Sequence, residues 1–148
     1  MTHASPTLTH WLVPFDGSEH ALHALQLALQ EARQRAVAPV LHILNVQLPL
    51  SADMTRFIDS KVTDGVHREA GEKALENAIA LLKDTDLTHK AHVLVGDVAH
   101  SIAAFAASHD CSLIVMGTRG QSSVMGLIMG SVTTRLLHES KVPVLLTR

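Results

Sequence analysis

Two kinds of apolar pattern alternate along the chain. Short, mostly apolar runs occur at Trp11 to Val13, Val40 to Val46 and Leu113 to Met116. Runs of this length, without regular apolar–polar alternation, are typical of parallel strands buried on both faces. Similar runs predict a third strand at Lys90 to Val95 and a fifth at Val142 to Thr147. The pattern therefore predicts five strands.

The segments between these runs carry apolar residues at helical spacing. Helices are predicted at Ala21 to Ala32, Val62 to Leu82, Val98 to Ala106 and Val132 to His138. The segment Gln47 to Lys61 has no clear period, so we expect a loop with helical turns. Strict alternation of strand and helix predicts an α/β fold: a single doubly wound domain over residues 1–148, with helices on both faces of a parallel sheet.

Composition narrows the classes of partner. The chain has 148 residues, 47% of them hydrophobic, and a net charge of -2 with no cluster of basic residues, which argues against nucleic-acid binding. No apolar run is long enough to cross a membrane. Residues 1–10 lack the basic and apolar regions of a secretory signal. We therefore expect a cytoplasmic domain that binds neither nucleic acid nor membrane.

A glycine motif lies between the fourth predicted strand and the last predicted helix. Gly117 and Gly120 are followed, after nine intervening residues, by Gly130-Ser131, which gives the spacing GxxG-x9-G[S/T]. A helix that begins there leaves N–H groups and hydroxyls at its positive dipole end, which is the chemistry of a phosphate-binding site. The alternative is a loop whose glycines serve only turns and caps. The full spacing arises by chance in roughly one chain of this length in a hundred.

Three segments end strands at the edge of the sheet where doubly wound folds bind ligands. They are Pro14-Phe15-Asp16, Asn45-Val46 and Met116 to Gly120. Apolar Val46 and Met116 come from different strands, so they are placed to enclose an aromatic base between them. For each of them alone, core packing is the alternative role.

Polar groups at the same edge are suited to the rest of a nucleotide. Asp16 is placed to accept a hydrogen bond from the base or from a ribose hydroxyl, and the alternative is a turn residue that bonds its own backbone. Arg119 has two interpretations, a solvated loop charge or a phosphate contact. The residues expected to receive phosphates are Gly117, Gly120, Gly130, Ser131 and Thr133.

Further motifs cover nearly the whole chain. They are Val13 to Ser18, Val95-Gly96-Asp97, Leu113 to Gly117, Gly120 with Gly130-Ser131, and Val142 to Leu146. Together they resemble the universal stress protein family. The resemblance implies a sheet in the order 3-2-1-4-5 with two helices on each face, and a homodimer formed through the last strand, Val142 to Thr147. It also implies a stress-response regulator of the ATP-binding branch, whose cofactor is ATP with or without Mg²⁺.

The resemblance assigns residues to parts of that ligand. Asp16 and Val46 would contact adenine and ribose, beside Pro14 and Phe15. Phe15 is bulkier than the small or β-branched residue common at its position. Ribose and phosphates would be surrounded by Met116, Gly117, Arg119, Gly120, Gly130, Ser131, Val132 and Thr133.

No pattern in the sequence predicts catalysis or a metal site. The P-loop lysine is absent and no general base is apparent near the glycine motif, so we expect binding rather than turnover. One alternative is an enzyme, a slow ATPase or phosphotransferase, for which self-modification at Ser131 or a nearby hydroxyl is one form. The other is a dimerisation module that binds no nucleotide. The 11 histidines lack metal-ligand spacing and are expected to be exposed and structurally neutral. Cys111 is expected to be an inert packing residue.

Overall fold

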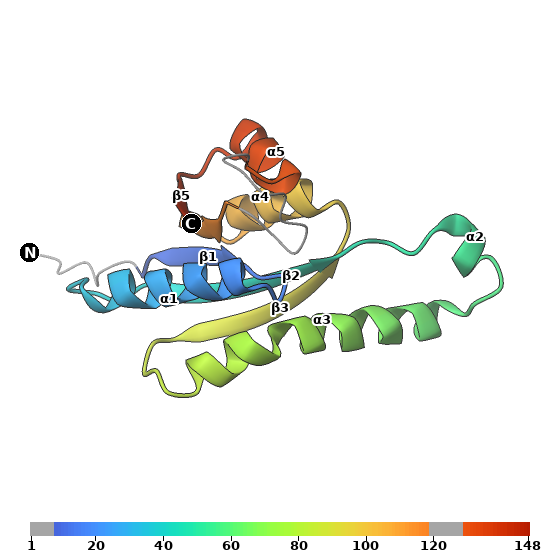
Figure 1. Ribbon diagram of the computed structural model, residues 1–148, viewed down its shortest axis with the longest axis horizontal. Helices are drawn as coiled ribbons and strands as arrows, with labels where there is room; N and C mark the ends of the chain where they lie inside the picture. The colour runs from blue at the N-terminus through green and yellow to red at the C-terminus, as the bar shows by residue number, and fades with distance from the viewer. Residues whose placement is uncertain (1–7, 119–128) are drawn as a thin grey trace, which may run out of the picture.

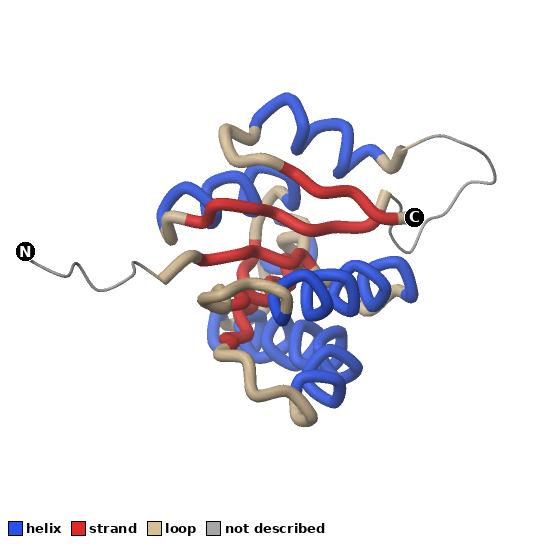
Figure 2. The backbone as a smooth tube through the Cα atoms, turned by 90° about the vertical axis from the view of Figure 1, so that its left-hand side faces the viewer, coloured by secondary structure: helices blue, strands red, loops and turns tan. Residues whose placement is uncertain are grey.

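The computed structural model of the chain describes residues 8–118 and 129–148. Five parallel strands form one sheet in the predicted order, β3-β2-β1-β4-β5, and Figure 2 shows strands of this sheet running alongside one another. None of the helices in these two ranges is long and apolar enough to cross a bilayer. The elements are β1 (His10–Pro14), α1 (Glu19–Arg33), β2 (Val40–Gln47), α2 (Ala52–Thr55), α3 (Ser60–Leu82), β3 (His89–Val95), α4 (Val98–Ser108), β4 (Cys111–Gly117), α5 (Ser131–Glu139) and β5 (Val144–Thr147).

Each face of the sheet has its own hydrophobic core. Successive residues of a strand point to opposite faces, so Trp11 and Val13 pack with α1 and α3, whereas Leu12 packs with α4 and α5. Figure 1 shows α4 and α5 on one side of the sheet and α3 on the other. The prediction of two helices on each face is confirmed. The short α2 has no buried residue and lies beyond the sheet, within the predicted loop.

Side-chain caps fix where two helices begin. Ser18 Oγ accepts a hydrogen bond from the Ala21 N–H (3.1 Å) at the start of α1, and the Asp97 carboxylate accepts one from the His100 N–H (3.0 Å) at the start of α4. Gly17 has a φ of 87°, which permits the tight turn between β1 and α1. Both helix starts therefore lie at defined positions beside the carboxyl ends of the strands.

The last strand begins two residues later than predicted. Ser140 Oγ accepts a hydrogen bond from the Val142 N–H (3.0 Å) and donates one to the Val142 carbonyl (2.8 Å), so this residue belongs to a turn. Pro143 has no N–H to donate, and its carbonyl accepts from the Ile114 N–H (2.9 Å). Regular pairing of β5 with β4 consequently starts at Val144.

Candidate functional site

A cavity of about 380 Å³ lies at the carboxyl ends of β1, β2 and β4, next to the first turns of α4 and α5. Its volume falls in the range of small-molecule sites. Arg119 and Gly120 lie outside the described residues. The other predicted site residues all line the cavity: Pro14, Phe15, Asp16, Val46, Met116, Gly117, Gly130, Ser131, Val132 and Thr133. The lining also includes Asn45, which the sequence placed at this edge without a role, and four residues that we did not predict: Ala21, Leu44, Val98 and Ile102.

Asp16 forms the turn that leads from β1 into α1. Its Oδ1 accepts a hydrogen bond from the Ser18 N–H (2.9 Å). This is the turn geometry that the sequence offered as the alternative to ligand binding. Because the half-buried Asp16 also lines the cavity, one carboxylate is both a turn residue and part of the site.

Asn45 connects the ends of β1 and β2 at the cavity. Its side chain is 3% exposed, and its Nδ2 donates a hydrogen bond to the Phe15 carbonyl (2.9 Å). Its Oδ1 accepts a hydrogen bond from Gln47 Nε2 (2.6 Å). Sequence reasoning missed this role, although an amide inside an apolar strand, one residue before Val46, was the available signal.

The Phe15 side chain leaves the cavity open. It is 2% exposed and belongs to the hydrophobic core on the α1 and α3 face. Its N–H donates to the Leu44 carbonyl (2.8 Å), which continues the pairing of β1 with β2. The cavity keeps its volume of about 380 Å³ with this bulky residue in place.

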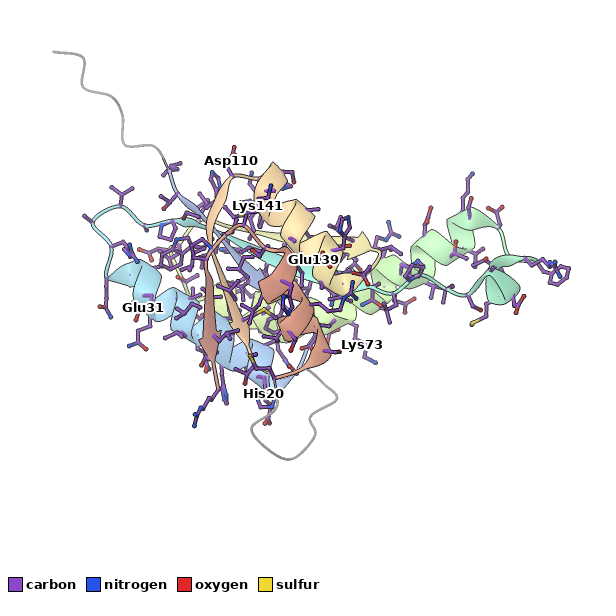
Figure 3. The ribbon with its side chains drawn as sticks, turned by 90° about the horizontal axis from the view of Figure 1, so that it is seen from above. His20, Glu31, Lys73, Asp110, Glu139 and Lys141 are labelled. Carbon is purple, nitrogen blue, oxygen red and sulfur yellow. The ribbon has the colours of Figure 1, made fainter. Side chains whose placement is uncertain are left out.

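Gly117 lets β4 approach α1 closely. A Cβ at this position would lie 3.0 Å from His20 Cβ and 3.1 Å from the His20 carbonyl oxygen. Figure 3 shows His20 on α1 at one edge of the molecule and Asp110, just before β4, at the other. His20 Nδ1 is buried and has no hydrogen-bond partner within the described part of the chain. Packing against the Cβ and backbone of His20 therefore requires a glycine at position 117.

The N-terminus of α5 forms the polar wall of the cavity. The Gly130 N–H donates to the Thr118 carbonyl (2.8 Å), and the buried Thr133 Oγ1 donates to the Gly117 carbonyl (3.4 Å). Among the residues that the structure describes, none caps this helix with its side chain, since the N-cap residue is Gly130. The N–H groups of its first turn, at Ser131 and Val132, have no partner in the preceding turn of a helix. They give the cavity hydrogen-bond donors at a positive dipole end.

An exposed ion pair joins the two helices that border the cavity. Arg135 Nη1 and Nη2 lie 2.8 Å and 3.0 Å from Asp97 Oδ1 and Oδ2, a bidentate arrangement. The hydrogen bond from Arg135, with a further one from the His100 N–H, lowers the pKa of Asp97. The first turn of α4, which contains Val98, is thereby linked to α5.

The unpredicted apolar lining comes from positions that the sequence assigned to the core. Val98 and Ile102 belong to the apolar stripe of α4, and Leu44 belongs to the apolar run of β2. They reach the cavity because it lies where the start of α4 meets the end of the sheet. Helical spacing alone does not distinguish such positions from fully packed ones.

The expectation that the histidines are exposed and structurally neutral is wrong for His42. Its side chain is 3% exposed, on the α4 face of β2, with ring nitrogens 3.0 Å from nitrogens of His10 and His92. Three strands far apart in sequence bring these rings together, so spacing along the chain gave no signal. Within residues 8–118 and 129–148, no group of three or more acidic, cysteine or histidine side chains is arranged to hold a metal ion.

The comparison with protein families identifies the family of this chain. The model of the universal stress protein family matches residues 8–148. The chain belongs to this family. The universal stress protein YxiE of Bacillus subtilis is 32% identical to it over 145 residues, which cover 93% of this chain and 97% of YxiE.

Solved structures of universal stress proteins share the fold. The structure of MJ0577 from Methanocaldococcus jannaschii is 26% identical and superposes with a TM-score of 0.78, covering 94% of each chain. The Archaeoglobus fulgidus universal stress protein, solved in complex with dAMP, is 22% identical with a TM-score of 0.67 and covers 97% of this chain and 100% of its own. These likenesses confirm the doubly wound architecture.

Proposed function

We propose that this universal stress protein binds an adenine nucleotide, ATP in particular, and acts in the cytoplasm as a non-catalytic regulator of the stress response. The observation that carries the proposal is the cavity itself, in which apolar residues from three strands face the N-terminus of α5. An apolar slot beside helix-end donors suits a flat base joined to an anionic tail. The family member solved with dAMP supports an adenine nucleotide as the ligand class.

In this proposal each wall of the cavity binds one part of the nucleotide. Val46 and Met116, both in the lining, enclose the base, and Asp16 accepts a hydrogen bond from the base or ribose. The phosphates meet the N–H groups and hydroxyls at Ser131 to Thr133, beside Gly117 and Gly130. Arg119 and Gly120 belong to the same glycine motif and are proposed as phosphate contacts with them. Mg²⁺, where present, arrives with the phosphates.

The groups among the described lining residues support the proposal of binding without turnover. Among the described residues that line the cavity, Asp16 is the sole carboxylate, and no lysine or histidine lines it. A phosphoryl-transfer site needs cationic or metal groups on the transferring phosphate and a positioned nucleophile. A bound ligand stabilises the folded chain by mass action, which links nucleotide level to protein stability.

We propose a homodimer through the last strand, as the family resemblance implies. β5 is an edge strand, and Leu145 on it is 37% exposed. An edge strand presents unpaired backbone groups that a second copy can cover. Replacement of Leu145 by Asp is expected to convert the dimer to a monomer in analytical ultracentrifugation. A wild-type protein that sediments as a monomer would contradict this part of the proposal.

Thermal unfolding with added nucleotide tests ligand binding. A micromolar affinity predicts about 4 kcal/mol of added stability at 1 mM Mg-ATP, and so a clear rise in Tm. AMP is expected to give a smaller rise because it engages fewer donors of α5. A Tm that does not change with ATP would contradict the proposal, whereas phosphate release above background that is lost in Asp16→Ala would indicate a slow ATPase.

A further inference from the structure

Four histidines from three strands and one helix end meet on the α4 face of the sheet. His10 Nδ1 lies 3.0 Å from His42 Nε2, and His42 Nδ1 lies 3.0 Å from His92 Nε2. The His109 ring at the end of α4 lies 5.6 Å from the His42 ring and 5.8 Å from the His92 ring, between centroids. We call His10, His42, His92 and His109 the histidine cluster.

The histidine cluster fastens the last turn of α4 to the sheet. Phe105 packs edge-on against the rings of His42 (5.7 Å) and His92 (4.8 Å). The His109 ring also stacks on Phe105, at 3.7 Å between centroids with an interplanar angle of 9°. His109 Nδ1 also lies 3.1 Å from the Phe105 carbonyl oxygen. One aromatic side chain thus joins the strand histidines to the helix histidine.

The strand register explains why three imidazoles form a chain. Leu12 of β1 is the register partner of His42, and Leu44 of β2 is the partner of His92. Each histidine is therefore offset by two residues from the next, and the three lie on one diagonal of a single face. Such a diagonal crosses β1, β2 and β3, so the chain of rings spans three of the five strands.

The number of protons that this chain can hold is limited. A neutral imidazole has one N–H and one bare nitrogen, and His42 uses both of its nitrogens within the chain. The two hydrogen bonds hold one proton each, and the outer nitrogens of His10 and His92 hold one each. Four protons therefore fill a chain whose three neutral rings already carry three. A second extra proton would place two N–H groups against each other and open a hydrogen bond.

The surroundings also oppose protonation. The pKa of His42 is lowered to about 4 by burial first, and then by His92, His10, His109 and Lys90. The pKa of His92 is lowered by burial, followed by His109 and Lys90. The groups that disfavour a positive charge on these two rings are bases: the neighbouring histidines of β1, β3 and the end of α4, and Lys90 of β3. The nearest acid in sequence, Asp110, follows His109 and acts on the Cys111 thiol.

We propose that the histidine cluster is an acid sensor, which holds the last turn of α4 and strand β3 on the sheet while its rings are neutral and releases them when it takes up protons. The trigger is the second extra proton on the imidazole chain of His10, His42 and His92, because the chain can hold only one extra proton with both hydrogen bonds intact. Two elements respond: β3, an edge strand that supplies His92, and α4, which His109 caps at its C-terminus. This device does not depend on nucleotide binding.

Acid destabilises the folded state, because between pH 6.5 and about 4 the unfolded chain binds a proton at His42 that the folded chain does not bind. Above the unfolded-state pKa of 6.5, His42 does not change the free energy of unfolding. As the pH falls from 6.5 to about 4, His42 lowers that free energy progressively. Between pH 7.5 and pH 5.0, His42 alone raises the equilibrium constant for unfolding roughly 30-fold. The lowered pKa of His92, and the inability of the imidazole chain to hold a second extra proton, increase this rise further.

Urea unfolding at pH 7.5 and pH 5.0 tests the proposal. In His42→Gln, the acid-induced rise in the unfolding constant is expected to be about 30-fold smaller than in wild type. In His92→Gln the reduction is expected to be smaller. His23→Gln, at an exposed position of α1, is the matched control and is expected to retain the wild-type rise. An equal rise in wild type and His42→Gln would overturn the proposal. So would a rise that disappears when EDTA is added, because that result indicates a metal site.

Hydrogen exchange of the wild-type protein provides a test that needs no variant to fold. At pH 5.0, amides in the last turn of α4 and in β3 are expected to lose protection before those of α1, after correction for intrinsic exchange rates. NMR titration is expected to show His42 neutral at pH 5.0. Uniform loss of protection across the domain, or a His42 ring that is already protonated at pH 5.0, would overturn the proposal.

Discussion

The Asn45 side-chain amide donates a hydrogen bond to the Phe15 carbonyl at 2.9 Å and so joins the carboxyl ends of β2 and β1 at the cavity. Replacement of Asn45 by Leu would leave that buried carbonyl and the Gln47 amide without this partner. We expect a loss of about 1–3 kcal/mol in the free energy of unfolding, measured with urea. Asn77→Leu, at an exposed site on α3, is the control and is expected to change it by less than about 0.5 kcal/mol. Equal effects of the two variants would contradict the role of Asn45.

Two glycine-to-alanine variants are expected to act in opposite directions. In Gly117→Ala the new methyl would meet His20 atoms at 3.0–3.2 Å, including its backbone, so we expect destabilisation by about 1–3 kcal/mol. In Gly65→Ala, within α3, nothing lies within 4 Å of the new methyl. Helix propensity then predicts stabilisation by about 0.5–1 kcal/mol. The same sign of Tm change in both variants would show that packing against His20 does not determine the residue at 117.

The Asp97–Arg135 pair predicts a distinct acid dependence. Because the folded-state pKa of Asp97 lies below the ordinary 3.8, its contribution is present above that pH and is lost as pH falls further. Asp97→Asn keeps a helix cap but removes the charge, whereas Asp97→Ala removes both. We expect the Tm at pH 7 to fall more for Ala than for Asn, and the difference between wild type and Asn to shrink at high salt. A salt-independent difference would argue against the ion pair.

Cys111 provides a simple test of the core on the α4 face. Burial first, and then Asp110, raises the pKa of its thiol to about 11, so the native protein contains little thiolate at pH 8. We expect iodoacetamide to label the folded protein far more slowly than the urea-unfolded protein. Because the chain has one cysteine, mass spectrometry reads this site alone. Labelling of the native protein at the unfolded rate would contradict the buried position of Cys111.

The fold was predictable because its pattern is local. Apolar runs such as Leu113 to Met116 lie within β4, and the stripe from Ala21 to Ala32 lies within α1. Strand order came from the family resemblance, since periodicity does not say which strands are neighbours. The start of β5 was predicted too early because a turn at Ser140 to Val142 depends on a side-chain hydrogen bond. An apolar pattern does not reveal that bond.

The site was predictable where a residue's type is unusual for its element, and not elsewhere. Glycines and Asp16 at strand ends pointed to the cavity, whereas Ile102 resembled any core residue. The histidine cluster depends on the registers of β1, β2 and β3, because His10 and His42 are 32 positions apart in sequence and His42 and His92 are 50 positions apart. Sequence spacing therefore could not reveal it, because only the folded sheet brings these rings together.

The central claim is that the N-terminus of α5 binds the phosphates of a nucleotide. Isothermal titration of ATP into wild type, Gly130→Asp and Gly65→Asp tests it most directly. The backbone at Gly130 (φ −59°, ψ 156°) accommodates Asp, which is itself a favourable helix cap, so the variant is expected to fold while its carboxylate repels the phosphates. We predict micromolar binding by wild type and Gly65→Asp, and at least tenfold weaker binding by Gly130→Asp. Equal ATP affinity in all three proteins would contradict the account.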